Sequence, residues 1–418
     1  MSKTETLTRA LPTTTTTTEP GPLLSHGLPF AAALLKHLDV TFHATRPYVI
    51  VSGSLARNTP YFSDLRQQLG DALVGFRLGL RSHTLWSEVL EVVADVRRYG
   101  ADCIVTLGAG SLTDAAKIVS YAVANSVSTV DELAALTADV TSALEDERRA
   151  AIRPSAIPII CIPTTLSGGE YSSFAGATND ADGRKYWFSG PWMAGPALVI
   201  LDPELATTTP DSVWLSSGVR ALDHCVETLC SLQSNDAADE TARLGLERLI
   251  PSLLRCKENP ADVDARLQCF LGARDAMVAA SSGVPLGASH GIGHQLGPAG
   301  VGHGETSCIL NPAVCKYNYA KKANVARQDA VVELLWQDAQ ASALFGTKGL
   351  RKESADLGDL MDAIIRALGL PRTLKEFSIG EERLDGIAEH SLLDRWVKTN
   401  PAPLDKAGVL EILRMVLE

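Results

Sequence analysis

Residues 103–117 have the sequence CIVTLGAGSLTDAAK, in which a β-branched run passes through two glycines into a helix-forming segment. Gly108 and Gly110 allow a tight turn between a strand and a helix. Backbone amides at such a helix N-terminus form an anion site, and Ser111 is placed to cap the helix. We therefore expect a cofactor pyrophosphate at this turn, with Asp114 one helical turn further on. The alternative is a tight turn without a ligand.

A second loop of small residues, PTTLSGGE over 163–170, follows the β-branched run that ends at Ile162. The hydroxyls of Thr164, Thr165 and Ser167 and the glycines would let a ribose, nicotinamide or phosphate approach closely. Such a stretch can also be a polar loop without a ligand. Two loops of this kind in one region favour a nucleotide site.

The end of the first expected strand, VSGSLAR over 51–57, has no acidic residue. NAD-selective folds usually place Asp or Glu here, where the carboxylate bonds the ribose 2′-hydroxyl and repels a 2′-phosphate. We expect Gly53 to lie against the cofactor, and our hypothesis is that NADPH is accepted, with the preference between NADH and NADPH left open. Lys185 is assigned to the same cofactor, although its neighbours also fit a solvated hairpin.

The order of the patterns predicts two domains after a disordered tail at 1–22, where six consecutive threonines precede Glu-Pro-Gly-Pro. From 23 to 210, β-branched runs alternate with amphipathic stretches, which is typical of a mostly parallel sheet covered by helices. From 211 to 418, apolar residues recur at helical spacing. The expected fold is an α/β NAD(P)-binding domain followed by an all-α catalytic domain, with ligands in a cleft between them.

The composition is that of a globular protein, with 418 residues, 45% hydrophobic content and a formal net charge of −11. That charge argues against binding nucleic acid or an anionic membrane, so a small molecule is the expected partner. The eight cysteines include no CxxC pair, and no apolar segment is long enough for a signal peptide or a membrane span. We expect a cytoplasmic protein with reduced thiols, assembled as a homodimer.

The helical half carries two histidine segments: GVRALDHCVE over 218–227 and HGIGHQLGPAGVGHGE over 290–305. His290 and His294 are four residues apart, so on a helix they share one face. His303 follows a turn of glycine and proline that can fold back toward them. A lone histidine is most often a satisfied surface or core group, but this grouping favours a site.

Together these segments resemble the iron-containing (group III) alcohol dehydrogenases. The shared motifs also include Asp-Pro at 202–203, Leu-Gly-Leu-Pro at 368–371 and Asn-Pro at 400–401. The resemblance implies a dehydroquinate-synthase-like fold that binds NAD(P). It also implies a metal held by one Asp and three His, whose histidine positions match His224, His290 and His303. The Asp position falls on Arg220, and His294 matches the family histidine near the nicotinamide.

Arg220 changes what this resemblance implies. A guanidinium stays protonated, so it removes a ligand and places positive charge beside the metal position, and we expect no bound iron or zinc. The adjacent Asp223 should point about 100° away from His224 and pair with Arg220 or a neighbouring helix. The interval from His294 to His303 is also one residue shorter than the resemblance implies.

One branch of the same family, the maleylacetate reductases, also lacks the Asp and works without metal. Its members reduce the carbon–carbon double bond of an unsaturated keto-dicarboxylate. They carry His-Ala-Glu where the alcohol dehydrogenases have His-Gly, and His303-Gly304-Glu305 is similar to a hybrid of the two. The branch usually has Asn at the position of Arg220.

We therefore expect a metal-free NAD(P)H-dependent reductase of an unsaturated or keto (poly)carboxylate, such as maleylacetate or a polycarboxylate of a secondary-metabolite pathway. Arg220 would bind the substrate carboxylate, and His290 or His294 would deliver the proton. An ion pair with Glu227 or Asp223 is the alternative for Arg220. A metal-dependent alcohol dehydrogenase and a non-catalytic nucleotide-binding relative are the competing functions, and a lyase of the dehydroquinate synthase type is a more distant one. The expected catalytic set is Arg220, His224, His290, His294 and His303.

Overall fold

The computed structural model describes residues 4–10, 21–81 and 83–418. The chain divides into two compact units, Met1–Thr208 and Thr209–Glu418. Each unit has its own apolar core and is described by itself.

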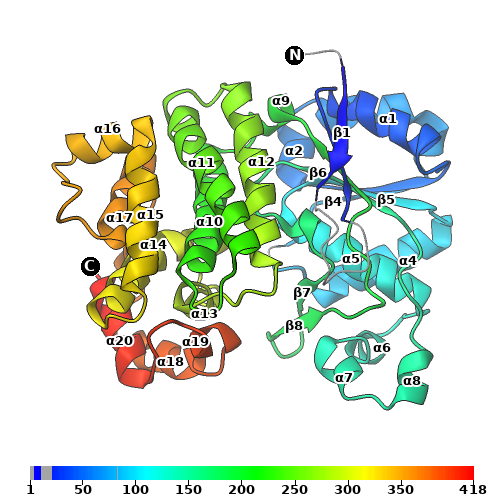
Figure 1. The fold of residues 1–418 in the computed structure, drawn as a ribbon. Coiled ribbons are helices and arrows are strands. Elements are labelled where there is room, and N and C mark those ends of the chain that lie inside the picture. The colour runs from blue at the N-terminus through cyan, green and yellow to red at the C-terminus, as the bar shows by residue number, and fades with distance from the viewer. Residues whose placement is uncertain (1–3, 11–20, 82) are drawn as a thin grey trace. The chain divides into compact units, whose positions relative to one another are not determined.

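The first unit is built on a seven-stranded sheet with the strand order β1-β2-β9-β6-β5-β3-β4 (Figure 1). All neighbouring strands in it are parallel except β1 and β2, which are antiparallel. The expected mostly parallel sheet is confirmed. The strands are β1 (Thr6–Arg9), β2 (Leu23–His26), β3 (Pro47–Val51), β4 (Gly75–Leu78), β5 (Cys103–Gly108), β6 (Ile159–Pro163) and β9 (Leu198–Leu201), and a separate antiparallel hairpin joins β7 (Ala175–Thr178) to β8 (Lys185–Phe188).

Helices cover both faces of this sheet (Figure 1). Tyr48 and Ile50 of β3 pack into the core formed with α4 and α5, whereas Val49 and Val51 pack into the core formed with α1 and α3. Because successive strand residues point to opposite faces and both faces are buried, the strand sequence is continuously apolar. The helices of this unit are α1 (Phe30–Val40), α2 (Gly53–Asn58), α3 (Tyr61–Leu69), α4 (Trp86–Tyr99), α5 (Gly110–Ala124), α6 (Val130–Ala134), α7 (Ala138–Ser142), α8 (Asp146–Ala150) and α9 (Pro203–Ala206).

The disordered tail predicted for residues 1–22 is wrong where the structure describes it. Thr6–Arg9 form β1, and Glu5 accepts hydrogen bonds from Ser25, Lys36 and His37. The threonine-rich composition concealed this strand because its partner lies on the other side of the low-complexity run. Residues 1–3 and 11–20 lie outside the described residues.

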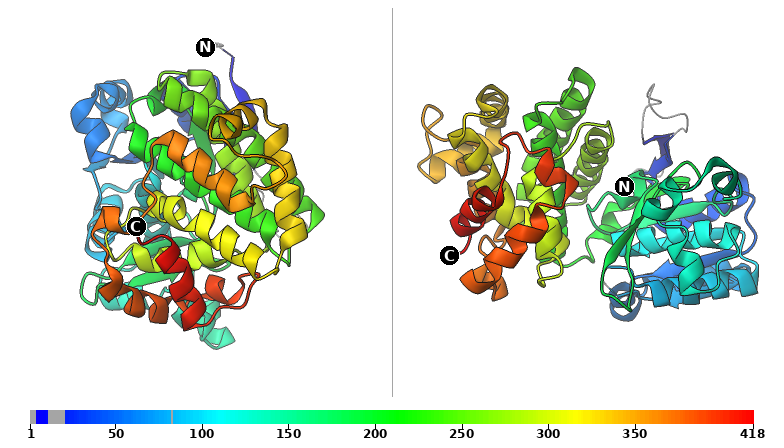
Figure 2. Two further views of the ribbon diagram at one scale, coloured as in Figure 1. Left: turned by 90° about the vertical axis from the view of Figure 1, so that its left-hand side faces the viewer. Right: turned by 90° about the horizontal axis from the view of Figure 1, so that it is seen from below.

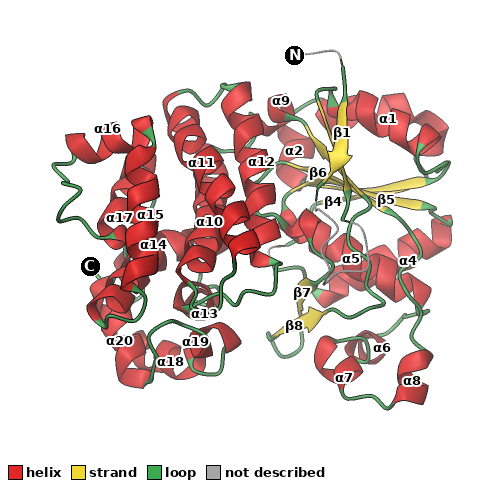
Figure 3. Cartoon of the chain, in the orientation of Figure 1, coloured by secondary structure: helices red, strands yellow, loops and turns green. Residues whose placement is uncertain are grey.

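The second unit consists of helices, and Figure 3 shows no strand in residues 209–418. Figure 2 shows these helices from two further sides, coloured from green at α10 to red at α20. They are α10 (Asp211–Cys230), α11 (Asp236–Glu258), α12 (Val263–Ala280), α13 (Ala288–Leu296), α14 (His303–Ala320), α15 (Val325–Gln337), α16 (Ala339–Thr347), α17 (Leu357–Leu368), α18 (Glu381–Ser391), α19 (Arg395–Lys398) and α20 (Lys406–Met415). The described helices include none that is both long and apolar enough to cross a bilayer.

Helix α10 lies at the centre of this unit, because it packs against α11, α12 and α14. Its residues from Trp214 to Thr228 are all buried. Polar side chains in this stretch must therefore find partners on the neighbouring helices.

Candidate active site

The strand order places a switch point between β3 and β5. The chain passes from β3 to β4 on one side and then to β5 on the other side of β3. In open parallel sheets, ligands bind beyond the carboxyl ends of strands at such a point. Gly53 follows β3, and Gly108 and Gly110 lie at the end of β5 and the start of α5.

Three loops meet at this edge of the sheet. A Cβ on Gly108 would lie 2.9 Å from the Cβ of Ser52, and a Cβ on Gly110 would lie 3.2 Å from the Cβ of Ser167. The loops after β3, β5 and β6 can approach this closely because both positions are glycine. Two hydrogen bonds also connect these loops internally and to one another: the amide of Thr164 donates to the carbonyl of Gly108 at 3.1 Å, and the hydroxyls of Thr165 and Ser167 are 3.0 Å apart. The structure thus brings together the predicted cofactor residues Gly53, Gly108, Gly110, Thr164, Thr165 and Ser167.

The prediction that Ser111 caps α5 is wrong. The helix begins at Gly110 with Ala109 as its N-cap, and no side chain caps it. Ser111 lies inside the first turn because the turn after β5 closes one residue earlier than the sequence pattern suggested. The first amides of this 15-residue helix are therefore open to an anion, which suits a cofactor phosphate.

Asp114 and Lys185 have structural partners as well. Asp114 lies 3.0 Å from the ammonium of the buried Lys117 and accepts a hydrogen bond from the amide of Gly176 at 3.3 Å. Lys185 lies in the exposed hairpin strand β8, with its ammonium 4.9 Å from the ring of Trp187. The hairpin given as the alternative for Lys185 is present, and Asp114 joins α5 to β7.

One face of α10 carries four charged or titratable side chains. Arg220, Asp223, His224 and Glu227 follow the spacing i, i+3, i+4 and i+7, which defines a single helix face. The expectation that Asp223 pairs with a neighbouring helix is confirmed, because its carboxylate accepts hydrogen bonds from Ser289 of α13 and Ser307 of α14. The same carboxylate also lies 3.2 Å from Nδ1 of His290, so Asp223 belongs to the cluster, which the sequence did not predict. A face of a helix is wide enough to include neighbours that are 100° apart.

Arg220 is buried, with 5% of its surface exposed. Its Nη1 donates a hydrogen bond of 3.1 Å to the hydroxyl of Ser307 and lies 4.0 Å from the carboxylate of Asp223. The ion pair with Asp223 that the sequence left open is thus present at long range, and none is formed with Glu227. Within the described ranges, Nε and Nη2 of Arg220 form no hydrogen bond.

Glu227 and His290 form a tight hydrogen-bonded pair. Nδ1 of His290 donates to Oε2 of Glu227 at 2.7 Å, and the amides of Gly287 and Ser289 donate to the same carboxylate at 3.0 and 2.8 Å. These bonds fix the imidazole and leave its buried Nε2 without a partner. The ring of His290 also stacks on that of His224, with centroids 4.6 Å apart.

His294 has a different partner from His290, although both lie on α13. Its Nδ1 is 2.8 Å from a carboxylate oxygen of Asp394, and its ring lies parallel to that of His303 with centroids 6.3 Å apart. The turn before His303 therefore folds back toward α13, as the sequence indicated. His294 and Asp394 are 19% and 15% exposed, respectively, at their side chains.

Helix α14 contributes the other wall of the cluster. His303, Ser307 and Asn311 are spaced by four residues, and the last two donate to Asp223 at 2.6 and 2.7 Å. Gly304 lies so close to α10 that a Cβ would stand 2.6 Å from the carbonyl oxygen of Ser216. An alanine here, the residue that the resemblance implies for maleylacetate reductases, would force α14 and α10 to move apart.

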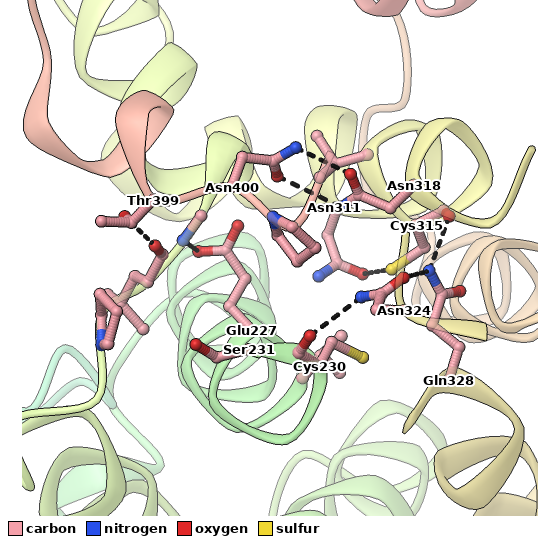
Figure 4. A pocket seen from close by; sticks show the side chains of 16 residues that line it. Glu227, Cys230, Ser231, Asn311, Cys315, Asn318, Asn324, Gln328, Thr399 and Asn400 are labelled. Carbon is pink, nitrogen blue, oxygen red and sulfur yellow. Dashed lines mark hydrogen bonds between the residues drawn. The ribbon is translucent and has the colours of Figure 1, made fainter. Parts of the chain in front are cut away.

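A small cavity of about 20 Å³ borders Glu227 (Figure 4). Its wall includes Asn318 and Asn400, whose amides exchange hydrogen bonds of 2.7 and 3.2 Å. Asn400 also accepts from the amide of Ala288 at 3.2 Å, so it fixes the first residue of α13. A space of this volume is about the size of one water molecule.

Burial governs the protonation of the cluster. It raises the pKa of Asp223 to about 7, with the charge of Glu227 acting in the same direction and that of Arg220 against it. It also raises the pKa of Glu227 to about 7, against backbone hydrogen bonds. Burial and the charge of Arg220 lower the pKa of both His224 and His290 well below their usual range. Both imidazoles are therefore neutral near pH 7.

The structure also tests which residues could hold a metal. Among the described residues, Asp223, Glu227 and His290 are the only group whose possible ligand atoms all lie within 4.8 Å of one another. His224, His290 and His303, the set implied for a bound metal, do not form such a group. A charge at Arg220 that lowers the pKa of the histidines would also repel a dication.

The Asp223, Glu227 and His290 group is close enough for one cation, but a hydrogen bond already joins His290 to Glu227. Two ligands of one zinc or iron ion stand about 3.4 Å apart when each bond is about 2.1 Å. His290 Nδ1 and Glu227 Oε2 are 2.7 Å apart. A metal here would have to replace the bridging proton and widen the group.

Sequence comparison then identifies the family. Residues 30–203 match "Iron-containing alcohol dehydrogenase", and residues 214–417 match "Fe-containing alcohol dehydrogenase family, C-terminal". The chain belongs to the iron-containing alcohol dehydrogenase family. It is therefore a dehydrogenase of this family, with the α/β and helical units that the sequence predicted.

Individual relatives refine this placement in the iron-containing alcohol dehydrogenase family. Dehydrogenase ALT3 of Alternaria alternata is 40% identical over 390 residues, which cover 89% of this chain and 99% of that protein. Dehydrogenase FUM7 of Gibberella moniliformis is 37% identical over 409 residues, covering 94% and 96%. Maleylacetate reductase of Rhizobium sp. strain MTP-10005 is 28% identical over 375 residues, covering 88% and 90%.

The crystal structure of that maleylacetate reductase has the same fold, with a TM-score of 0.74 at 23% identity over 96% of this chain and 97% of the reductase. The two fungal dehydrogenases share more of the sequence than the reductase does. The maleylacetate reductases are thus members of the same family but more distant from this chain.

Sequence reasoning missed several residues of the cluster. Asp394 is 100 residues from His294, so no local pattern joins them. Ser307 and Asn311 could have been found from their spacing of four after His303. Glu227 stood in the quoted His224 segment, and its place one turn after His224 was the signal for its role.

Proposed function

We propose that this dehydrogenase reduces an unsaturated or keto (poly)carboxylate with NAD(P)H and without a metal ion. The observation that carries the proposal is Arg220, a buried cation standing among the histidines where the resemblance implies an acidic metal ligand. Nη1 of Arg220 donates a hydrogen bond to Ser307. The other two guanidinium nitrogens, Nε and Nη2, form no hydrogen bond among the described residues. Two neighbouring N–H groups of a guanidinium suit the two oxygens of a carboxylate.

The loops at Gly108–Gly110 and Thr164–Ser167 fit a dinucleotide, since glycines keep the turn open and α5 has uncapped amides. NAD(P)H bound there supplies the hydride. Arg220 binds the substrate carboxylate and stabilises the negative charge that develops on the substrate oxygen. A fixed positive side chain thereby takes the place of a Lewis acid.

His294 delivers the proton in this proposal. It is partly exposed, so it can exchange protons with solvent, and Asp394 holds Nδ1 and orients the ring. His290 is only 2% exposed, and its Nδ1 lies 2.7 Å from Glu227 and 3.2 Å from Asp223. This fixed, buried position suits a residue that orients the substrate better than one that carries a proton. His224 and His303 stack on these two rings and position them.

A metal-dependent alcohol dehydrogenase is the second candidate, and one observation favours it. The ligand atoms of Asp223, Glu227 and His290 lie within 4.8 Å of one another in a buried place. In that case a cation would displace the proton between Glu227 and His290.

Two measurements on the purified protein separate these candidates. Metal content is measured by mass spectrometry, and NAD(P)H oxidation is followed with unsaturated dicarboxylates, 2-keto acids and aldehydes, with and without chelator. We expect no stoichiometric metal and turnover with carboxylates only. A stoichiometric ion together with loss of activity in chelator would establish the second candidate instead.

The role of Arg220 is tested by Arg220→Met. Loss of a charge-assisted carboxylate contact should lower kcat/KM for the carboxylate substrate about 100-fold. Arg266→Met is the matched control, because Arg266 is also a buried arginine of this unit but packs on Trp214. Unchanged kcat and KM in Arg220→Met would refute the carboxylate role.

A further inference from the structure

Helix α2 starts at the carboxyl end of β3 and places Arg57 one turn after Gly53. A Cβ on Gly53 would lie 3.0 Å from Nη1 and 3.5 Å from Nη2 of Arg57. The guanidinium therefore rests directly over Gly53. NAD-selective sites place the ribose-binding Asp or Glu at the corresponding strand end.

Arg57 has no partner within the described part of the chain: no hydrogen bond, ion pair or ring contact engages its guanidinium. Two nearby arginines of the same unit are engaged, since Arg77 pairs with Glu91 at 2.6 Å and Arg81 with Glu88 at 3.3 Å. The positive charge at Gly53 is thus available to a ligand.

The turn that carries Arg57 lies next to the turn between β5 and α5, where a cofactor phosphate is expected. Gly108 would meet the Cβ of Ser52 at 2.9 Å if it carried a side chain, so the turns after β3 and β5 touch. Because β3 and β5 are adjacent, a dinucleotide with its pyrophosphate at the start of α5 would place its adenosine ribose at the neighbouring strand end, near Gly53. The hydroxyls of Ser52 and Ser54, which are 3.0 Å apart, add hydrogen-bonding groups at the same turn.

We propose that Arg57 binds the 2′-phosphate of NADP(H) and makes this dehydrogenase selective for the phosphorylated cofactor. The proposal rests on the nucleotide site of the proposed function and adds the residue that sets its selectivity. A guanidinium donates two parallel hydrogen bonds to a phosphate dianion, and Gly53 leaves room for that phosphate. The 2′-hydroxyl of NAD(H) offers no charge to this arginine.

Isothermal titration calorimetry tests the proposal without any turnover. Adenosine 2′,5′-bisphosphate and adenosine 5′-monophosphate are titrated into the full-length protein, and their affinities are compared. The wild type should bind the bisphosphate at least about tenfold more tightly than the monophosphate, and Arg57→Gln should bind the two with about equal affinity. Arg98→Gln is the control, because α4 ends at Tyr99 and places Arg98 at the amino ends of the strands.

A second variant tests the same site with Arg57 still present. Gly53→Asp adds a Cβ that would lie 3.0 Å from the flexible end of Arg57 and in ordinary contact, at 3.5 Å, with Cα of Gly79. The domain should therefore fold, and the added carboxylate should remove its preference for the bisphosphate. Equal affinities in the wild type, or an unchanged ratio in Arg57→Gln, would overturn the proposal. If neither adenosine nucleotide binds the wild type, the nucleotide site of the proposed function itself fails.

Discussion

Arg220 donates a hydrogen bond of 3.1 Å from Nη1 to the hydroxyl of Ser307. Ser307 in turn donates to the carboxylate of Asp223 at 2.6 Å, while Arg220 and Asp223 stay 4.0 Å apart. A hydroxyl thus links the two charges and fixes the direction of the guanidinium without a short ion pair. Nε and Nη2 of Arg220 form no hydrogen bond within the described ranges, so these N–H groups can still donate to a second anion.

Ser307→Ala should weaken substrate binding more than turnover. Without the hydroxyl, Nη1 loses its acceptor and the guanidinium is no longer held in one direction. We expect KM for the carboxylate substrate to rise about 5- to 10-fold, with a smaller fall in kcat. Ser391→Ala removes another buried hydroxyl of this unit, one that donates to the backbone of α18, and should leave KM unchanged. The same KM in Ser307→Ala as in the wild type would show that Arg220 needs no such support.

Asp394→Asn should lower kcat about 10- to 100-fold with little change in KM, because Asn presents an N–H group where His294 now meets a carboxylate oxygen. Steady-state kinetics with saturating cofactor measures this split. Asp405→Asn is the matched control, since both aspartates are N-caps and Asn caps a helix equally well. Equal kcat in the two variants would remove Asp394 from the proton-transfer machinery.

Glu170 in the loop after β6 predicts a pH dependence of stability. Burial raises its pKa from 4.5 to about 7, against the charge of Lys117. The folded protein holds this proton more tightly than the unfolded chain, so ionisation between pH 4.5 and 7 lowers the free energy of unfolding.

Glu170→Gln cannot ionise, so its free energy of unfolding relative to the wild type should rise from pH 4.5 to 7 and then level off. Urea unfolding of both proteins across this range measures the difference. A difference that does not vary with pH would contradict the buried, protonated carboxyl.

Gly304→Ala should destabilise the helical unit by about 1–3 kcal/mol, because the new methyl group meets the backbone of α10, which cannot move away cheaply. Gly386→Ala is the control, because Gly386 lies inside α18 and a Cβ there would meet no neighbouring side chain or element within 4 Å. This substitution should raise the free energy of unfolding by about 0.5–1 kcal/mol. Denaturant unfolding compares the two. A free energy of unfolding in Gly304→Ala equal to that of the wild type would mean that α14 can shift away from α10.

The fold could be read from the sequence because its signals are local. Val49 and Ile50 lie in one continuous apolar run and face opposite cores. Such an uninterrupted apolar run is typical of a strand that is buried on both faces of a sheet. The helical unit follows in the same way from apolar residues at helical spacing. β1 could not be read, because a short strand is stabilised by its partner across the sheet rather than by its own composition.

The candidate site was predicted only in part. The location of the site could be predicted from the histidines on α10, α13 and the start of α14, because histidine is rare in this chain and these four lie in two short segments. Their partners could not be assigned, because the bonds from His290 to Glu227 and from His294 to Asp394 span 63 and 100 residues. Periodicity gives a face of a helix but not the helix that packs on it.

The strand at Thr6–Arg9 has a practical consequence for recombinant production. A gene trimmed to begin at residue 23, as the sequence pattern alone would recommend, would encode a protein whose sheet ends at β2. The backbone groups of Leu23–His26 that now pair with β1 would then be open to a neighbouring molecule. Such a product would be prone to edge-to-edge aggregation during purification, so the full N-terminus belongs in any expression plasmid.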